Sequence, residues 1–235
     1  TSSDIGLAND GDSDRLGVVD KDGKYISSLQ IFALLCLHQL KFLGNKAPIV
    51  KSITMTNMID KLGKYYNVPV FSTSVGFKNI APIMISENAM AAGEESGGYA
   101  FNNNMPERDG ILSGLLLLEM MAISGKSLSE LIELLESKVG TNHYNRIDIR
   151  IQDDQKKELM DKLISSPLVH IGDKKVLAFD NTDGFKYILD DEGSWLLIRF
   201  SGTEPLLRIY AECQNQNDTQ NILNSAIDIM GIDAN

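Results

Sequence analysis

The chain has 235 residues, enough for one large domain or two of ordinary size. Its composition, 43% hydrophobic and 23% charged, is typical of a soluble globular protein. The formal net charge of -10 argues against nonspecific nucleic-acid binding, but local positive charge in a cleft can still hold an anionic ligand. Cys36 and Cys213 lie in apolar runs without metal-ligand spacing, so we expect two buried thiols in a reducing, cytoplasmic compartment.

The first half of the chain alternates predicted strands and helices. Residues 5–27 have a strand, loop, strand, turn, strand pattern, in which Asp22-Gly23 is a hairpin signal. Further strands are expected at 48–54 and 68–73, with short strands around a loop in 89–101. Helices are expected at 29–43, 57–66 with Asn57 as its N-cap, 76–88 broken by Pro82, 110–124 capped by Asp109, and 128–139 capped by Ser127. This alternation predicts βαβ units and a mostly parallel sheet.

The run at 29–43 is the most apolar in the chain. It is too short for a membrane span and contains His38, Gln39 and Lys41, so we expect a core helix and no membrane association.

The pattern changes after Gly140. Residues 143–152 alternate as a strand with one wet face, 153–166 form an amphipathic helix, and 217–230 form a closing helix. Four strands joined by turns are expected at 175–180, 185–190, 194–200 and 206–213. We therefore expect a separate α+β domain with an antiparallel sheet, and place the boundary at 140–142.

The stretch NDGDSDR places Asp10, Asp12 and Asp14 two residues apart, with only small residues between them. Converging carboxylates repel each other unless a cation neutralises them, and oxygen ligands indicate Mg²⁺ or Ca²⁺. An EF-hand is excluded because its sixth position would be Arg15 rather than glycine and its twelfth Lys21 rather than glutamate. Arg15 beside a cation is explained if an anion bridges the two; the alternative is an acidic turn in water.

The stretch GEESGG combines three glycines with polar side chains. The glycines allow close backbone approach, and Glu94, Glu95 and Ser96 offer the acceptors and hydroxyl that bind polyols. Upstream, VGFKNI places Lys78 two residues after Gly76. Taken alone, a plain glycine-rich loop and a solvated helix lysine are the simpler interpretations.

The stretch IRFSGTEPLLRIY places two arginines around a small turn. Ser201, Gly202 and Thr203 offer two hydroxyls and successive backbone N–H groups, a nest for an anion. Arg199 can reach in as a fork, and Arg208 can flank it from the next strand. The functional interpretation is a phosphate clamp; the alternative is an ordinary turn with two surface arginines.

In this order, the three stretches resemble loops of the α-D-phosphohexomutases, the family of phosphoglucomutases and phosphomannomutases. DGDSDR (residues 10–15) resembles the family's metal loop, GEESGG (93–98) its sugar loop and RFSGTEP (199–205) its phosphate loop. VGFK followed by NI resembles the segment before the sugar loop. The resemblance covers essentially the whole chain and implies the end of domain 2 (1–28), an α/β domain 3 (29–139) and an α+β domain 4 (140–235).

The resemblance implies interconversion of hexose 1-phosphate and hexose 6-phosphate through a phosphoserine and a hexose 1,6-bisphosphate intermediate. The family's serine lies in a Thr-x-Ser-His-Asn-Pro loop of domain 1, and this chain has no Ser-His pair. The chain also enters a strand-like segment soon after Thr1. We therefore expect an inactive fragment that exposes apolar surface where the missing N-terminal domains would pack.

The resemblance also implies roles for individual residues. Asp10, Asp12 and Asp14 would hold Mg²⁺, Arg15 and Lys78 would face the reacting end, and Glu94 and Ser96 would grip sugar hydroxyls. Arg199, Ser201, Gly202 and Thr203 would clamp the non-reacting phosphate, with Arg208 as a weaker candidate.

The identity of the hexose is less directly indicated. Glucose phosphate is favoured over mannose phosphate, because phosphoglucosamine mutases and many phosphomannomutases have a histidine where this chain has Gly98. The alternatives are a phosphoglucosamine mutase and a non-catalytic sugar-phosphate-binding fragment. A haloacid-dehalogenase-type phosphatase fits less well, because it leaves the Ser-Gly-Thr-Glu-Pro turn unexplained.

Overall fold

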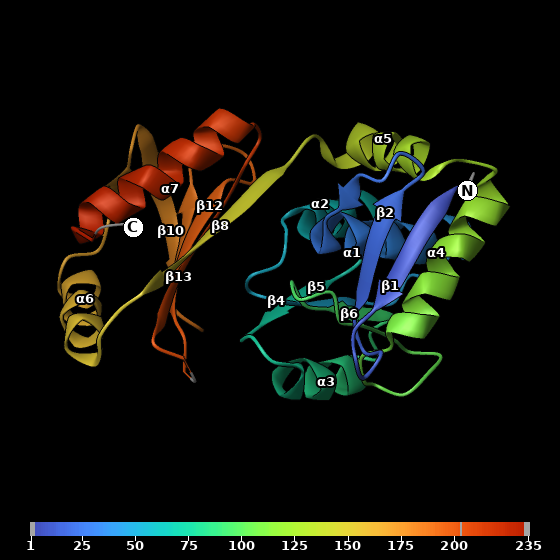
Figure 1. The fold of residues 1–235 in the computed structure, drawn as a ribbon, viewed down its shortest axis with the longest axis horizontal. Helices are drawn as coiled ribbons and strands as arrows, with labels where there is room; N and C mark the ends of the chain where they lie inside the picture. The colour runs from blue at the N-terminus through green and yellow to red at the C-terminus, as the bar shows by residue number, and fades with distance from the viewer. Residues whose placement is uncertain (1–2, 203, 233–235) are drawn as a thin grey trace. The chain divides into compact units, whose positions relative to one another are not determined.

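The computed structural model describes residues 3–202 and 204–232. The chain divides into two compact units, residues 1–140 and 141–235 (Figure 1). Each unit has its own strands and its own helices.

The first unit begins with a three-stranded antiparallel sheet. It contains β1 (Ile5–Asn9), β2 (Leu16–Asp20) and β3 (Tyr25–Ile26), in the order β1-β2-β3. The predicted hairpin turn joins β2 to β3, and Gly23 has the positive φ of 79° that glycine adopts without strain. The Asp20 carboxylate accepts hydrogen bonds from the backbone N–H groups of Asp22 and Lys24, which stabilises the turn.

The second sheet of this unit is mixed. Its strands are β4 (Ile49–Ser52), β5 (Val70–Thr73), β6 (Ala91–Gly93) and β7 (Tyr99–Phe101), in the order β5-β4-β6-β7. The first three are parallel and β7 is antiparallel, so the predicted mostly parallel sheet is confirmed. The hairpin from β6 to β7 places the sugar loop at one end of the sheet.

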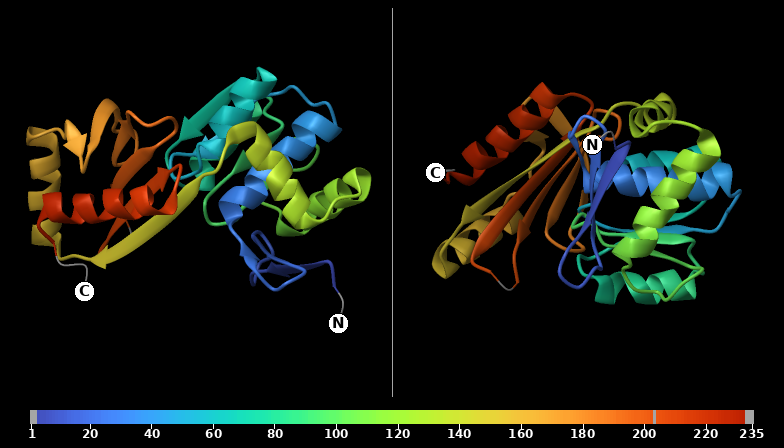
Figure 2. Two further views of the ribbon diagram at one scale, coloured as in Figure 1. Left: turned by 90° about the horizontal axis from the view of Figure 1, so that it is seen from above. Right: turned by 45° about the vertical axis from the view of Figure 1, so that its right-hand side comes forward.

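Helices cover both faces of the mixed sheet (Figures 1 and 2). They are α1 (Ser28–Leu37), α2 (Met58–Tyr66), α3 (Phe77–Ser86), α4 (Gly110–Ser124) and α5 (Leu128–Val139). α3 packs Phe77, Ile80 and Met84 against one face of the sheet. On the other face, Phe32 of α1 stacks on Tyr99 with ring centroids 5.3 Å apart. Among the described residues, no single helix is long and apolar enough to cross a membrane. Together, α4 and α5 have the length and composition of a span, but the pair is bent by 86°.

Two predicted helices differ in the structure. The helix expected at 29–43 is α-helical only to Leu37 and continues as a π-helix, His38–Phe42. There the buried His38 ring finds a partner in Glu119 of α4, with Nε2 and Oε2 2.7 Å apart. Pro82 does not break α3: the backbone hydrogen bond that proline cannot donate is outweighed by the packing of this helix on the sheet.

Of the predicted helix caps, Asp109 is confirmed and Asn57 is not. Asp109 caps α4 by accepting from the Leu112 N–H at 2.8 Å, as expected. The Asn57 side chain makes no capping bond to α2; instead the Thr56 hydroxyl accepts from the Met58 N–H at 3.0 Å. The hydroxyl one residue earlier therefore takes the role that the sequence suggested for Asn57.

The described residues of the second unit form a six-stranded antiparallel sheet with two helices, so the predicted α+β fold is confirmed. Its strands are β8 (His143–Arg150), β9 (His170–Ile171), β10 (Lys174–Asp180), β11 (Phe185–Leu189), β12 (Trp195–Phe200) and β13 (Leu206–Cys213), in the order β8-β13-β12-β11-β10-β9. The helices α6 (Asp153–Ser165) and α7 (Gln216–Met230) share one apolar core with the sheet. The short strand β9 was not foreseen from the sequence.

The capping box of α5 gives the first testable prediction. The Ser127 hydroxyl accepts from the Glu130 N–H at 3.4 Å, and the Glu130 carboxylate accepts from the Ser127 N–H at 2.8 Å. Replacing Ser127 with Ala should lower the free energy of unfolding by about 1 kcal/mol, as measured by urea denaturation followed by circular dichroism. Ser137→Ala, on the exposed face of α5, is the control; an equal effect of both changes would contradict the capping role.

Candidate functional site

The metal loop connects β1 to β2 and is closed by its own hydrogen bonds. The Ser13 N–H donates to the Asp10 carbonyl and the Arg15 N–H to the Asp10 carboxylate, both at 3.1 Å. Ser13 adopts a positive φ of 62°, which curls the loop tightly. Asp10, Asp12 and Asp14 each offer one carboxylate oxygen, and these atoms lie within 4.8 Å of one another.

The electrostatics of the loop fit a hard divalent cation. Burial raises the pKa of Asp14, Arg108 lowers it, and the nearby carboxylates of Asp12 and Asp10 raise it further. Burial opposes ionisation of Asp10 as well, but a hydrogen bond from the Arg15 backbone N–H leaves the pKa of Asp10 lowered. Oδ1 of Asp14 is buried without a hydrogen-bond partner among the described residues. Nε of Arg15 lies 3.7 Å from this oxygen, an ion pair longer than a hydrogen bond. A buried carboxylate oxygen without a hydrogen bond, in a set of oxygen donors, suits Mg²⁺.

Two distant segments hold the metal loop in place. The Leu16 N–H donates to the Gly97 carbonyl of the sugar loop at 3.0 Å, and Arg15 and Gly98 form an antiparallel bridge. From the start of α4, the Gly110 N–H donates to the Ser13 carbonyl, also at 3.0 Å. A Cβ on Gly110 would lie 2.3 Å from the Arg15 carbonyl oxygen, so this close approach requires glycine.

The sugar loop positions a buried carboxylate. Gly97 has a φ of 93°, and the loop is closed by hydrogen bonds between Glu94 and residues 97 and 98. Oε1 of Glu94 accepts from the Gly76 N–H at 2.7 Å, which ties the sugar loop to the start of α3. Burial raises the pKa of Glu94, although the Gly76 N–H and Arg108 act in the opposite direction.

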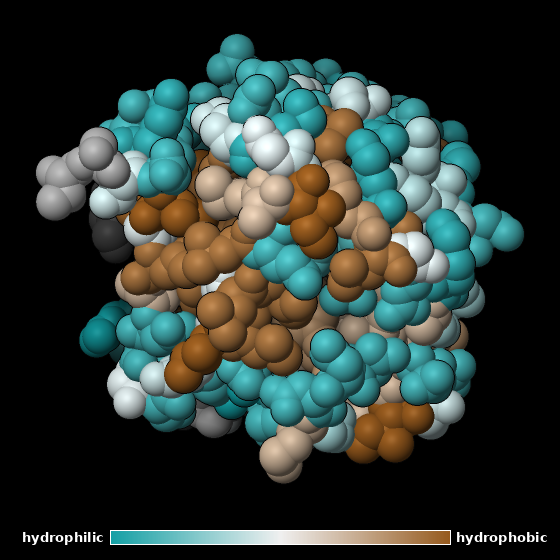
Figure 3. Space-filling model, turned by 90° about the vertical axis from the view of Figure 1, so that its right-hand side faces the viewer, coloured by the Kyte–Doolittle hydropathy of each residue, from teal (hydrophilic) through white to brown (hydrophobic). Residues whose placement is uncertain are grey.

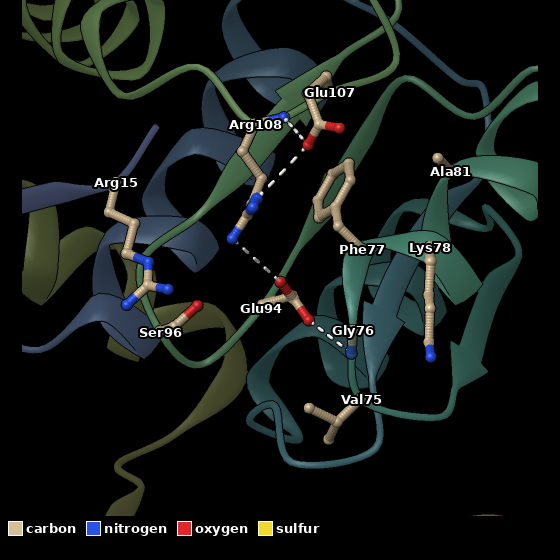
Figure 4. Close-up of a pocket in the computed structure, with 10 residues that line it drawn as sticks. All are labelled: Arg15, Val75, Gly76, Phe77, Lys78, Ala81, Glu94, Ser96, Glu107 and Arg108. Atoms are coloured by element: carbon tan, nitrogen blue, oxygen red, sulfur yellow. Dashed lines mark hydrogen bonds and ion pairs between the residues drawn. The ribbon is translucent and has the colours of Figure 1, made fainter. Parts of the chain in front are cut away.

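A pocket of about 570 Å³ opens between these segments (Figure 4). Four of the predicted site residues line it: Arg15, Lys78, Glu94 and Ser96. Arg15 and Ser96 lie on one side and Lys78 on the other, with Glu94 between them (Figure 4). Cations, a carboxylate and a hydroxyl around one space can hold a polyol that carries an anionic group.

Sequence reasoning missed Arg108, which also lines the pocket. Its Nη2 lies 2.8 Å from Oδ2 of Asp14, and its Nη1 lies 4.0 Å from Oε2 of Glu94. The available signal was its position: a charged residue directly before the predicted cap Asp109, at the end of the segment that follows the sugar loop.

The phosphate loop lies in the second unit, between β12 and β13. Arg199 and Arg208 are directly opposite in the antiparallel register, so both side chains project from the same face of the sheet. Each is neutralised within the unit. Nε of Arg199 donates to Asp183 at 3.0 Å, and Arg208 pairs with Glu204 and lies 3.8 Å from Asp148.

The turn of the phosphate loop is partly described. The buried Ser201 accepts the Glu204 N–H on its hydroxyl at 3.2 Å, and Gly202 is exposed with open space at its Cβ position. Thr203 lies outside the described residues, so the predicted nest of successive N–H groups stays a prediction. Asp183, the partner of Arg199, lies in the turn DNTDG (residues 180–184), which joins β10 to β11. The sequence alone gives no signal for its pairing with Arg199.

The buried state of Glu94 leads to a pH-dependent prediction. Because its pKa is raised in the folded protein, its ionisation destabilises the fold at neutral pH, and this cost fades as the pH falls toward the ordinary value of 4.5. Glu94→Gln should therefore raise the thermal midpoint at pH 7, with a gain that shrinks near pH 4.5. Differential scanning calorimetry across this range, with the exposed Glu133→Gln as control, measures it. A destabilised Glu94→Gln variant at pH 7 would count against the assignment of a burial cost.

Comparisons with known proteins cover nearly the whole chain. The family model "Phosphoglucomutase/phosphomannomutase, alpha/beta/alpha domain III" matches residues 27–138, and "Phosphoglucomutase/phosphomannomutase, C-terminal domain" matches 149–229. A phosphoglucomutase/phosphomannomutase of Thermococcus kodakarensis is 32% identical over 97% of this chain and 47% of the relative. A phosphoglucosamine mutase of Methanocaldococcus jannaschii is 33% identical over 96% of this chain and 48% of the relative. The chain thus spans about half the length of these relatives.

Solved structures agree with this assignment. A Thermus thermophilus protein, provisionally named a phosphomannomutase, superposes with a TM-score of 0.80 at 31% identity, over 97% of this chain and 46% of its own. Aspergillus fumigatus N-acetylphosphoglucosamine mutase, solved with GlcNAc-6P and magnesium, shares the fold, with a TM-score of 0.62 at 16% identity over 99% of this chain and 50% of its own. The haloacid-dehalogenase alternative is set aside. With both of its units matched by models of one family, the chain belongs to the phosphoglucomutase/phosphomannomutase family.

Proposed function

We propose that this chain supplies the metal, sugar and phosphate loops of a phosphohexomutase. The enzyme would interconvert hexose 1-phosphate and hexose 6-phosphate through a phosphoserine and a hexose 1,6-bisphosphate intermediate. The observation that carries the proposal is the pocket in which Arg15, Lys78, Glu94 and Ser96 meet beside the metal loop. Its size lies within the range of about 300–1,000 Å³ that small-ligand sites occupy.

Asp10, Asp12 and Asp14 would hold Mg²⁺, which neutralises charge on a transferring phosphoryl group when it is bound. The support from this chain is the cluster of oxygen donors, in which Oδ1 of Asp14 makes no hydrogen bond among the described residues and has only Nε of Arg15 near it, at 3.7 Å. A protein of the same fold, from Aspergillus fumigatus, was solved with magnesium and a sugar phosphate.

The chain's own residues divide the remaining work. Arg15 and Lys78 would place positive charge around the reacting phosphoryl group, where positioning and electrostatics account for most of the catalysis. The Glu94 carboxylate accepts hydrogen bonds from sugar hydroxyls, and the Ser96 hydroxyl both donates and accepts them. Glu94 is already held by the Gly76 N–H, so its orientation is set before the sugar binds.

The phosphate loop would clamp the non-reacting phosphate. Arg199 and Arg208 project from one face of the sheet, and each is paired with carboxylates of the chain itself. A bound phosphate would replace these carboxylates as the partner of both guanidinium groups. Ser201, Gly202 and Thr203 would complete the clamp with hydroxyl and backbone N–H donors.

The phosphoserine would lie in polypeptide outside this chain, in N-terminal domains of the same protein. An apolar face of the first unit supports this (Figure 3). It is formed by exposed side chains of β1, β2, β3 and α4: Leu7, Val19, Tyr25, Ile111, Leu115 and Leu118. Among the described residues, β1 also pairs on one side only and is an edge strand of its sheet. An apolar face beside an open strand edge is the surface that a further domain would cover.

We propose glucose phosphate as the preferred substrate, with mannose phosphate second. The support is the sugar loop, in which Gly98 stands where a histidine is common in phosphoglucosamine mutases and many phosphomannomutases. A phosphoglucosamine mutase is the second candidate, because a relative with that name is 33% identical.

The clamp can be tested by removing Arg199. Loss of a charge-assisted hydrogen-bond donor should cost about 2–3 kcal/mol of binding, or roughly a 30- to 150-fold loss of affinity. The measurement is calorimetric titration of Arg199→Ala with glucose 1-phosphate and Mg²⁺. Lys175→Ala is the control, because it removes one exposed positive charge of the same unit, on β10 and outside the phosphate loop.

A loss below about threefold for Arg199→Ala would refute the clamp. Parallel titrations with mannose 1-phosphate and glucosamine 1-phosphate rank the hexoses, and the tightest ligand identifies the substrate class.

A second test concerns the missing serine. The chain alone should bind sugar phosphate but form no glucose 6-phosphate from glucose 1-phosphate and the 1,6-bisphosphate, in an assay coupled to glucose 6-phosphate oxidation. Turnover by the purified chain, with no contaminating mutase, would contradict the placement of the phosphoserine outside it.

A further inference from the structure

Arg108 joins two loops of the proposed site through one guanidinium group. It lies between β7 and α4, and its side chain is 25% exposed. Nη2 lies 2.8 Å from Oδ2 of Asp14 in the metal loop, while Nη1 faces Glu94 of the sugar loop at 4.0 Å (Figure 4). At these distances the contact with Asp14 is a charge-assisted hydrogen bond, whereas the contact with Glu94 is a looser ion pair.

The Arg108 side chain is held along its length. Its Nε lies 3.4 Å from Oε1 of Glu107, and Cζ lies 5.7 Å from the centroid of the Phe77 ring, within the range of a cation–π contact. Its aliphatic stem runs past Gly98: a Cβ on that glycine would lie 2.3 Å from Cδ and 2.9 Å from Cγ of Arg108. Even an alanine at position 98 would therefore displace the arginine.

The bond to Arg108 orients the Asp14 carboxylate within the metal loop. It occupies Oδ2, while Oδ1 is buried, makes no hydrogen bond among the described residues and lies 3.7 Å from Nε of Arg15. Without the arginine, repulsion from Asp10 and Asp12 would favour rotation of the Asp14 carboxylate away from the cluster. With it, Oδ1 keeps only the long ion pair with Arg15 among the described residues, and a cation can replace that contact.

We propose that Arg108 is a positioning residue of the metal site, and that Gly98 is small in order to admit it. The inference rests on the metal site of the proposed function. Arg108 also brings a positive charge near the cation. If this repulsion were its main effect, removal of Arg108 would strengthen cation binding. We place the positioning effect first, because groups that orient metal ligands typically contribute about 10- to 100-fold in affinity.

The test is Mn²⁺ binding, followed by electron paramagnetic resonance of the free ion. Arg108→Gln should bind Mn²⁺ about 10-fold more weakly than the unsubstituted chain, with Arg108→Lys between them because lysine keeps the charge but not the fork. Gly98→Ala should weaken binding as Arg108→Gln does. The double variant should be no weaker than either single one, since both changes remove the same contact. Arg146→Gln, in the second unit, should bind as the unsubstituted chain does.

Equal or tighter binding by Arg108→Gln would overturn the proposal, as would additive losses in the double variant. Circular dichroism identifies any variant that fails to fold. If Arg108→Gln does not fold, Arg108→Lys is the remaining test, and Mn²⁺ affinity equal to that of the unsubstituted chain would overturn the proposal.

Asp12→Asn distinguishes failure of the role of Arg108 from failure of the proposed metal site. If Asp12→Asn abolishes binding and Arg108→Gln does not change it, the metal site stands and the role of Arg108 falls. If the unsubstituted chain binds no Mn²⁺, both fall.

Discussion

The proposed site in the first unit depends on backbone hydrogen bonds among three segments that are distant in sequence. The Ser13 carbonyl of the metal loop accepts a hydrogen bond from the Gly110 N–H at the start of α4. The Leu16 N–H, directly after the metal loop, donates to the Gly97 carbonyl of the sugar loop. Gly110 permits this because a side chain there would strike the metal loop, and Gly97 permits it through its positive φ. Main-chain contacts therefore fix the aspartates of the metal loop relative to the glutamate of the sugar loop. Because both loops are already ordered, ligand binding costs little of their conformational entropy.

Charge is the second organising feature. The chain is strongly acidic, yet cationic side chains gather at the two places where an anion is proposed to bind. In the first unit, Arg15, Lys78 and Arg108 line one pocket. In the second, Arg199 and Arg208 share a face of the sheet. Arg199 and Arg208 are paired with carboxylates of the chain, so an anionic ligand would exchange one negative partner for another rather than meet bare charges.

The sequence predicted those parts of the fold and site whose signals are local. The metal and sugar loops were recognisable because carboxylates, hydroxyls and glycines are adjacent along the chain, and the strand and helix alternation gave the class of each unit. Arg108 and Asp183 were missed because each matters through a partner that only the fold brings near: Asp14 is far from Arg108 along the chain, and Arg199 lies on the strand after the one that follows Asp183. The π-helical turn at His38 depends likewise on Glu119, a tertiary partner.

We propose that three aspartates of one short loop converge to hold a divalent cation beside a sugar-phosphate pocket. The most direct measurement is an anomalous difference map from crystals of the chain grown with Mn²⁺. We expect one strong peak within coordination distance of Asp10, Asp12 and Asp14, with Oδ1 of Asp14 among the ligands. A map without a peak at these residues, from crystals that hold Mn²⁺ elsewhere, would contradict it.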